Sequence, residues 1–199
     1  MRARGHRNAS RKPSRKRWQV ESGRFQVLPL RAAAQNLPLA IYCRPPMKIG
    51  VISDTHGFLD PRVEKIFRGV DHIFHAGDIG DPLIELELKF IAPVTAVIGN
   101  TDSGLSFPVT AVQKLAQKKF LIHHIVNPHS LSPEAAAALA REKPDAIIFG
   151  HTHKAFAQTV NGVFYFNPGY SGQPRLGAER SVAILRLDGE KISHEFIRL

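Results

Sequence analysis

The chain has 199 residues, of which 43% are hydrophobic, so it is long enough for one domain of ordinary size with a buried core. Its single cysteine, Cys43, excludes an internal disulfide framework and a cysteine-based zinc site. No apolar run reaches the length of a membrane-spanning helix, so we expect no membrane partner and a cytoplasmic location, where an unpaired thiol is acceptable.

The formal net charge of +10 is concentrated at the N-terminus. Residues 1–46 hold eleven Arg and Lys against one acid, Glu21, which leaves 16 of the 27 basic and 16 of the 17 acidic residues in 47–199. The extension could be a basic arm for nucleic acid or anionic lipid, an Arg-rich targeting segment, a disordered tail, or sequence translated from an upstream start. We favour the last two, because Met47 directly precedes the first predicted strand. The neutral remainder lacks the footprint of a nucleic-acid-binding domain, so no nucleic-acid partner is expected.

From Met47 onward, short apolar strands alternate with amphipathic helices, which predicts one α/β domain over residues 47–199. In chain order, this first half is expected to contain a strand at 48–53, a helix at 61–70, a strand at 72–76, a helix at 82–89 and a strand at 95–98.

The second half begins with two predicted strands, 109–115 and 119–122. A helix at 133–143 follows, with Ser132 as its N-cap, Pro133 in its first turn and Pro144 after its end. A strand at 146–149 comes next. The hairpin-turn signals Asn161-Gly162 and Asp188-Gly189 then predict an antiparallel meander of four strands, at 156–160, 163–166, 181–187 and 191–197.

Five polar clusters each follow an apolar strand: Asp54-Thr55-His56, Gly77-Asp78, Gly99-Asn100-Thr101-Asp102, His123-His124 and Gly150-His151-Thr152-His153. Ligands of open α/β sheets bind at the carboxyl ends of the strands, so these loops are expected to converge. One such cluster alone is more often a turn or a structural histidine, but turn chemistry does not explain the ordered set. Imidazoles, carboxylates and an amide together suit Mn²⁺, Fe²⁺, Zn²⁺ or Ni²⁺. They are too many for one ion and suit two ions about 3.5–4 Å apart.

The ordered D-x-H, G-D, G-N-x-D, H and G-H-x-H blocks, with MKIGVISDTHG and IIFGHTH, resemble the calcineurin-like metallophosphoesterases. Within that family the likeness is closest to the small bacterial and archaeal phosphodiesterases of the YfcE type, and it covers essentially all of 47–199. The resemblance implies a four-layer α/β/β/α sandwich, with two mixed sheets flanked by helices. It also implies two divalent ions, most readily Mn²⁺. One would be bound by Asp54, His56 and His153, the other by Asn100, His124 and His151, and Asp78 would bridge them.

The resemblance further implies a hydrolase that cleaves P–O bonds of a small phosphoester, with a diester as the expected substrate. Two cations would screen the phosphoryl charge, and a water shared between them would yield the attacking hydroxide. Asp78, Asn100 and Asp102 are the predicted catalytic-site residues, although Asp102 could equally be a structural hydrogen-bonding residue. The alternative is a non-catalytic protein-binding scaffold, like a retromer subunit of similar fold, but every expected ligand position holds a competent side chain. By analogy with the family, a homodimer is also open.

Three positions depart from the family pattern. Larger phosphatases of the superfamily have a histidine after the metal-binding asparagine, where this chain has Thr101, so we expect activity to favour good leaving groups such as nitrophenolate. In place of T-H-G-H the chain reads His123-His124-Ile125-Val126, and we expect His124 to face the metals because neighbouring strand residues point to opposite faces. Tyr170 interrupts the N-P-G-S loop. The remaining histidines of the domain are expected to be packing, surface or loop residues: His72, His75, His129 and His194.

Overall fold

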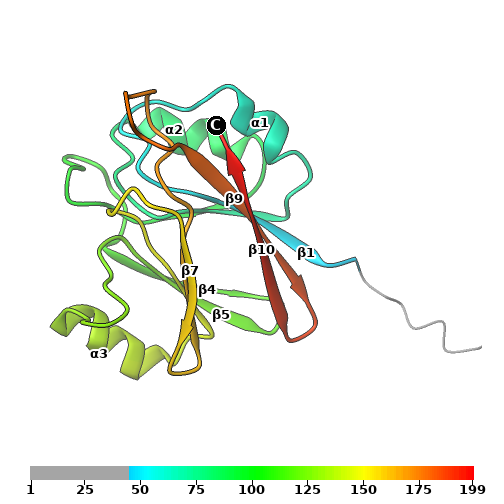
Figure 1. Ribbon diagram of the computed structural model, residues 1–199, viewed down its shortest axis with the longest axis vertical. Coiled ribbons are helices and arrows are strands. Elements are labelled where there is room, and N and C mark those ends of the chain that lie inside the picture. The colour runs from blue at the N-terminus through cyan, green and yellow to red at the C-terminus, as the bar shows by residue number, and fades with distance from the viewer. Residues whose placement is uncertain (1–44) are drawn as a thin grey trace, which may run out of the picture. The chain divides into compact units, whose positions relative to one another are not determined.

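The structure is a computed structural model that describes residues 45–199, so Cys43 and nearly all of the expected basic extension lie outside the described residues. Two five-stranded sheets pack face to face. Helices α1 (Arg62–Ile66) and α2 (Pro82–Lys89) lie outside one sheet, and α3 (Pro133–Glu142) lies outside the other (Figure 1). The four-layer α/β/β/α sandwich predicted from the sequence is therefore confirmed.

The first sheet has the strand order β10-β9-β1-β2-β3. Its central strands β1, β2 and β3 are parallel, whereas β9 runs antiparallel to both β1 and β10. The sheet is therefore mixed, and the carboxyl ends of its parallel strands share one edge. The bounds are β1 (Met47–Ile52), β2 (His72–His75), β3 (Val94–Ala96), β9 (Ser181–Asp188) and β10 (Lys191–Arg198).

The second sheet has the order β4-β5-β6-β8-β7, in which β5, β6 and β8 are parallel and the outer strands β4 and β7 are antiparallel to their neighbours. The bounds are β4 (Thr110–Leu115), β5 (Lys118–His123), β6 (Ala146–Ile148), β7 (Phe156–Val160) and β8 (Val163–Asn167).

The prediction of one antiparallel meander after His153 is wrong. The β7–β8 hairpin belongs to the second sheet and the β9–β10 hairpin to the first. Both expected hairpins are present. Asn161 and Gly162 have φ of 50° and 81°, as a two-residue hairpin turn requires. In the second hairpin Asp188 pairs with Lys191, so the turn residues are Gly189, with a φ of 54°, and Glu190 rather than the predicted Asp188-Gly189. Turn residues fix a hairpin locally, but they do not determine which sheet it joins. Here β8 pairs in parallel with β6, while β9 pairs with β1 on the other sheet.

The hydrophobic core is divided by the two sheets. Ile49, Val51 and Phe74 of the first sheet pack against Phe120, Ile122 and other buried residues of the second. On the outer face of the first sheet, Ile52 and Ile73 pack against residues of α1 and α2, and a smaller cluster lies beneath α3. Strands β1 and β2 are thus buried on both faces, which explains their continuous apolar sequences.

The helices agree with the sequence except for the first. Helix α2 has the predicted bounds, and α3 begins after Ser132, whose hydroxyl accepts the Ala135 N–H at 3.2 Å. The helix predicted at 61–70 ends at Ile66, because Phe67 leaves helical geometry and Gly69 turns the chain at a φ of 78°. No helix of residues 45–199 is both long and apolar enough to cross a membrane.

Candidate metal centre

The predicted ligand loops meet at the edge where the parallel strands of both sheets end. The loop after β1 is tied to the loop after β2 by N–H donation from Asp54 to the Gly77 carbonyl (3.0 Å) and from His56 to the Asp78 carbonyl (2.9 Å). In the second sheet, Gly150 donates its N–H to the His124 carbonyl at 3.0 Å. The two sheets are joined here because the His151 N–H lies 3.2 Å from both carboxylate oxygens of Asp54.

The backbone at this edge is unusual. Of the eight non-glycine residues with positive φ in the described part of the chain, five are predicted metal ligands: Asp54, His56, Asp78, His151 and His153. Each left-handed non-glycine residue costs roughly 1 kcal/mol or more, and such strain persists where the surrounding structure enforces it. Its concentration at these positions indicates a functional site.

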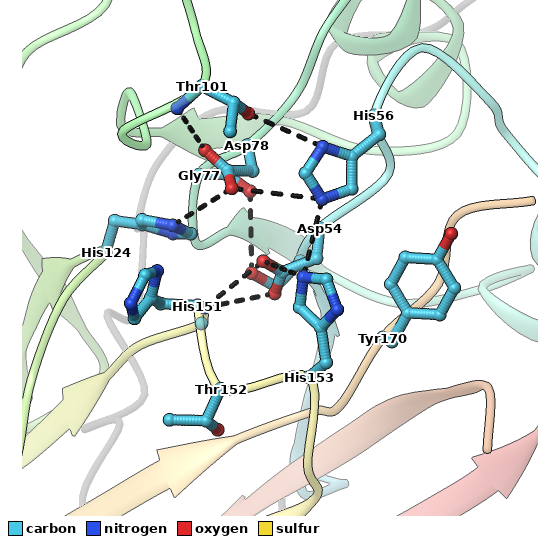
Figure 2. Close-up of polar contacts among 12 residues, drawn as sticks. Asp54, His56, Gly77, Asp78, Thr101, His124, His151, Thr152, His153 and Tyr170 are labelled. Atoms are coloured by element: carbon cyan, nitrogen blue, oxygen red, sulfur yellow. Dashed lines mark hydrogen bonds and ion pairs between the residues drawn. The ribbon is translucent and has the colours of Figure 1, made fainter. Parts of the chain in front are cut away.

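Asp54, His56 and His153 form the first ligand group. One potential ligand atom from each lies within 4.8 Å of the other two. Nε2 of His153 is 3.3 Å from Oδ1 of Asp54 and 3.4 Å from Nε2 of His56 (Figure 2). The sequence assigned these three residues to one ion, and the structure brings them together.

Asp54, Asp78 and His124 form a second group. One potential ligand atom from each again lies within 4.8 Å of the other two. Nε2 of His124 lies 3.4 Å from Oδ2 of Asp78. The His151 ring packs edge-on against His124, with 5.4 Å between centroids, and Asn100 lines the same hollow as His124. Asn100 and His151 therefore lie near His124, but both are exposed, and His151 belongs to neither ligand group.

Two carboxylates, rather than one, lie between the groups. Oδ2 of Asp78 is 3.8 Å from Nε2 of His56 and 3.4 Å from Nε2 of His124, which is the position expected of a bridging ligand. Asp54 belongs to both groups, whereas the sequence assigned it to the first alone.

His124 provides the most specific observation. Its Nδ1 lies 2.7 Å from the carbonyl oxygen of buried Ala76, a distance and partner that place the proton on Nδ1. The lone pair of Nε2 then points into the cluster, yet this buried nitrogen has no hydrogen-bond partner among residues 45–199. Buried polar atoms almost always have a partner, and metal-ligating histidines commonly donate their other N–H to a carbonyl. A cation at this position would satisfy Nε2, so the residues present fit a divalent metal.

The two carboxyl groups differ in their electrostatics. Burial raises the pKa of Asp54, and the neighbouring Asp78 adds to that rise, although Ser53 and nearby imidazoles oppose it. Burial also opposes ionisation of Asp78, but hydrogen bonds from Thr101 and the imidazoles of His124 and His56 outweigh it and lower the pKa. Asp54 and Asp78 have carboxylate oxygens within 4.8 Å of each other. Two buried acids this close destabilise the fold unless positive charge is present. This donor set is therefore suited to cations.

Asp102 and Thr101 hold the Asp78 loop in place. The Asp102 carboxylate accepts three backbone N–H groups, from Ile79 (3.1 Å), Gly80 (2.8 Å) and Gly99 (2.8 Å). Thr101 donates its backbone N–H to Oδ1 of Asp78 at 2.9 Å. Both oxygens of Asp102 are thus turned toward backbone, which indicates that it positions the site.

Glycines beside the ligands allow close approach. A Cβ added to Gly99 would lie 2.0 Å from Oδ1 of Asp78, and one added to Gly150 would lie 2.0 Å from Oγ of Ser53 and 2.8 Å from Asp54. No side chain can occupy either position without displacing a carboxylate or its support. This close packing explains the glycine before each of these polar loops.

Sequence reasoning overlooked the support that lies beneath the ligands. His75, set aside as a packing or surface histidine, is fully buried; its Nδ1 accepts the Gly77 N–H (3.3 Å) and its Nε2 contacts the Thr55 hydroxyl (3.0 Å). Asn167 donates to the Gly150 carbonyl (2.7 Å) and to Oγ1 of Thr152 (3.1 Å), which secures the His151–His153 turn. Apart from the local His75–Gly77 hydrogen bond, these contacts join separate segments of the chain, so no local pattern could have identified them.

The other noted residues take distinct positions. His123 is hydrogen-bonded to the Thr110 hydroxyl at 2.7 Å and belongs to neither ligand group. His72 contacts Thr95, His194 packs on phenylalanines, and His129 is exposed. Tyr170, the departure in the N-P-G-S loop, is buried and stacks on His153 (Figure 2).

The fold and the ordered polar blocks agree with a known protein family. The Calcineurin-like phosphoesterase superfamily domain matches residues 47–190. The chain belongs to this family. The resemblance inferred from its ordered polar blocks is therefore confirmed.

Its relatives include enzymes and a sorting protein. The chain is 38% identical to a probable metallophosphoesterase of Methanothermobacter thermautotrophicus over 76% of this chain and 92% of that protein. It is 30% identical to phosphodiesterase YfcE of Escherichia coli (71% and 89% covered) and 41% identical to vacuolar protein sorting-associated protein 29 of Schizosaccharomyces pombe (76% and 83% covered). The solved structure of a novel archaeal phosphodiesterase superposes with a TM-score of 0.61 at 25% identity, covering 77% of this chain and all of that one.

Proposed function

We propose that this calcineurin-like phosphoesterase is a hydrolase of small phosphodiesters that uses two divalent metal ions, with Mn²⁺ as the preferred ion. The proposal rests above all on the unpartnered Nε2 of His124, which is buried and aimed at Asp78 with its proton held on the opposite nitrogen. A structural histidine would have found a hydrogen-bond partner, whereas a metal ligand keeps this lone pair free.

The proposed ligands divide into two groups that share carboxylates. Asp54, His56 and His153 would hold one ion, and Asn100, His124 and His151 the other, with Asp78 between them. When bound, the pair of ions would offset the charge of a phosphoryl group and supply hydroxide near neutral pH. Mixed imidazole, carboxylate and amide donors favour Mn²⁺-like ions over Mg²⁺ or Ca²⁺, which prefer all-oxygen sites.

The surrounding residues would position these ligands rather than react. The Asp102 carboxylate accepts three backbone N–H groups, two from the loop that carries Asp78 and one from the residue before Asn100, and so connects these two loops. Thr101 holds Asp78 by its N–H, and its hydroxyl lies 3.4 Å from Nδ1 of His56. A threonine at this position supplies no group that titrates near neutral pH to protonate a leaving oxygen. The chain would therefore act best on esters whose leaving group needs no acid.

The substrate is proposed to be small and not a nucleic acid. Residues 47–199 carry equal numbers of basic and acidic residues, so the domain offers no net positive charge to a polyanion. The similarity to proteins named as phosphodiesterases supports a diester in particular.

The test is hydrolysis of bis(p-nitrophenyl) phosphate by metal-stripped protein, followed by addition of Mn²⁺. We expect turnover that requires Mn²⁺, is abolished by EDTA, and falls at least about 100-fold in His124→Ala. His129→Ala, which removes an exposed loop histidine, is the matched control and should retain full activity. Activity that is indifferent to metal, or equal loss in both variants, would refute the proposal.

A second candidate function is a protein-binding scaffold without catalysis. It is favoured by the similarity to vacuolar protein sorting-associated protein 29 and by three exposed apolar side chains, Leu83 and Leu86 on α2 and Phe90 at its C-terminal end, which are 57%, 48% and 84% exposed. The same assay separates the two candidates, because a scaffold would bind ions without turning over any ester.

A further inference from the structure

A groove leads away from the ligands of the proposed second ion. A hollow of about 160 Å³ is bordered by Asn100 and His124 at one end and by Ile98, Val109 and Ile125 along its sides. A second hollow of about 550 Å³ shares Val109, His123 and Ile125 with the first and ends at Ser132 and Glu134. The two hollows share three lining residues and therefore lie next to each other; together they are here named the apolar groove.

The apolar groove has two hydrophobic side chains on its sides that are unusually exposed to solvent. Val109 is 58% and Ile125 is 45% exposed, and both lie among the few large apolar residues exposed in the described part of the chain. They come from different segments, Val109 from just before β4 and Ile125 from just after β5, which pair so that Thr110 lies opposite His123. Apolar side chains that line a depression beside a polar cluster are typical of small-molecule sites, where apolar contacts bind and a few polar groups orient.

The far end of the groove offers no site for a second anion. The Ser132 hydroxyl accepts the Ala135 N–H at 3.2 Å as the N-cap of α3, and no Lys or Arg of residues 45–199 lines either hollow. Glu134 stands in the first turn of α3, where its carboxylate offsets the positive end of the helix. His123 in the floor is hydrogen-bonded to Thr110. A ligand that fills the groove should thus be uncharged beyond its first phosphate.

We propose that the apolar groove binds one ester substituent of the substrate, and that this substituent is an uncharged aromatic or other apolar group. The inference rests on the proposed function, since it places the phosphoryl group at the ligand cluster and the substituent beside Asn100 and His124. An apolar groove at this position favours diesters with at least one apolar substituent as substrates. It disfavours substrates with several phosphates in a row, such as an oligonucleotide.

The test compares two diesters with the same leaving group, phenyl p-nitrophenyl phosphate and methyl p-nitrophenyl phosphate. Val109→Ser and Ile125→Ser each remove one side of the groove. The control is Val112→Ser, in strand β4 directly after Val109, because Val112 is 40% exposed and lies outside the groove. We expect each groove variant to lower kcat/KM for the phenyl ester roughly tenfold, the size of effect that loss of an apolar contact produces. The control should match the unmodified protein.

The pattern of losses identifies which arm is bound. A loss for the phenyl ester alone places the retained substituent in the groove, and a loss for both esters with unchanged metal content places the leaving group there. Either result supports the proposal. Groove variants that behave like Val112→Ser with both esters would overturn it.

A separate binding measurement keeps the groove distinct from catalysis. Phenylphosphonate added to the full chain should shift the NMR amide signals of Val109 and Ile125, and methylphosphonate at the same concentration should not. If no ester is turned over, the hydrolase proposal fails, and this measurement alone decides the groove. Absence of the shifts would refute an apolar subsite, whatever the outcome for catalysis.

Discussion

The ring of Tyr170 stacks on the imidazole of His153, with 4.7 Å between the ring centroids and 25° between the planes. Tyr170 is 1% exposed and donates its hydroxyl to the Gln173 carbonyl at 3.0 Å, so the ring is held from both ends. The stack fixes the orientation of an imidazole that belongs to the first ligand group.

Replacing Tyr170 should therefore affect metal binding as well as stability. Tyr170→Ala is expected to cost about 3 kcal/mol of unfolding free energy, as large-to-small core changes do. It should also weaken Mn²⁺ binding about tenfold, because His153 loses its support. Tyr170→Phe keeps the stack and should lose only about 1 kcal/mol, with affinity unchanged. Urea unfolding and calorimetric Mn²⁺ titration measure both; equal affinities in the Ala and Phe variants would contradict the proposed role.

Asp102 should be required for the geometry of the site rather than for a chemical step. Asp102→Asn keeps the shape but presents an NH₂ group to at least one of the three backbone donors, at an expected cost of about 1–3 kcal/mol. The displaced Asp78 loop should lower kcat at least about tenfold. The control is Asp71→Asn, which replaces an exposed carboxylate that accepts one N–H within residues 45–199, that of Lys48. A variant with normal stability but lost activity would instead give Asp102 a direct catalytic role.

Burial of His75 predicts a pH dependence of stability in metal-free protein. Desolvation lowers the pKa of His75 to about 3; the charges of Asp102 and Asp78 oppose this shift, and those of His124 and His56 add to it. The folded state thus keeps His75 neutral, while the unfolded chain takes up a proton below its ordinary pKa of about 6.5. As the pH is lowered from about 6 to about 3, this group alone should reduce the free energy of unfolding by about 1.4 kcal/mol per pH unit.

The comparison that isolates this effect is His75→Gln against His129→Gln, each unfolded in urea with EDTA at several pH values between 7 and 4. All other histidines are common to the two variants, so the difference between the slopes compares buried His75 with the exposed loop residue His129. We expect the slope to become shallower by about one proton in His75→Gln only. Parallel curves for the two variants would show that His75 is free to ionise in the fold.

Thr101 predicts how rate depends on the leaving group. With a hydroxyl where an acid would be needed, p-nitrophenyl esters should be hydrolysed much faster than alkyl esters of the same phosphate, by about 100-fold or more. Rates for a series of leaving groups of increasing basicity measure this dependence. Equal rates for alkyl and nitrophenyl esters would indicate that another group donates the proton.

The sequence predicted most of the fold because its local signals were strong. Asp81 and Pro82 begin α2, Ser132 and Pro133 begin α3, and Asn161-Gly162 forms a hairpin, as turn and cap chemistry requires. Where the outcome depended on contacts distant in sequence, the predictions were incomplete. Strand β9 pairs with β1, at the other end of the domain sequence, which no local signal showed. The early end of α1 is different, because Gly69 is a local turn signal that the helix prediction overlooked.

For the site, the predictable part was the set of donors and the unpredictable part was their support. Polar residues after buried strands indicated Asp54, Asp78 and His124, since parallel strands bring their ends together. The left-handed backbone at the ligands, the membership of Asp54 in both groups and the buried contacts of His75 are properties of packed loops. No pattern along the chain encodes them.

The proposed dinuclear centre requires both ligand groups to bind divalent ions. Counting the bound ions is its most direct test. Protein stripped of metal, dialysed against Mn²⁺ and analysed for elemental content should hold two ions per chain. His124→Ala should hold close to one, and His129→Ala should still hold two. Retention of no divalent ion by the unmodified chain, or an undiminished content in His124→Ala, would contradict the assignment of this cluster as a dinuclear metal centre.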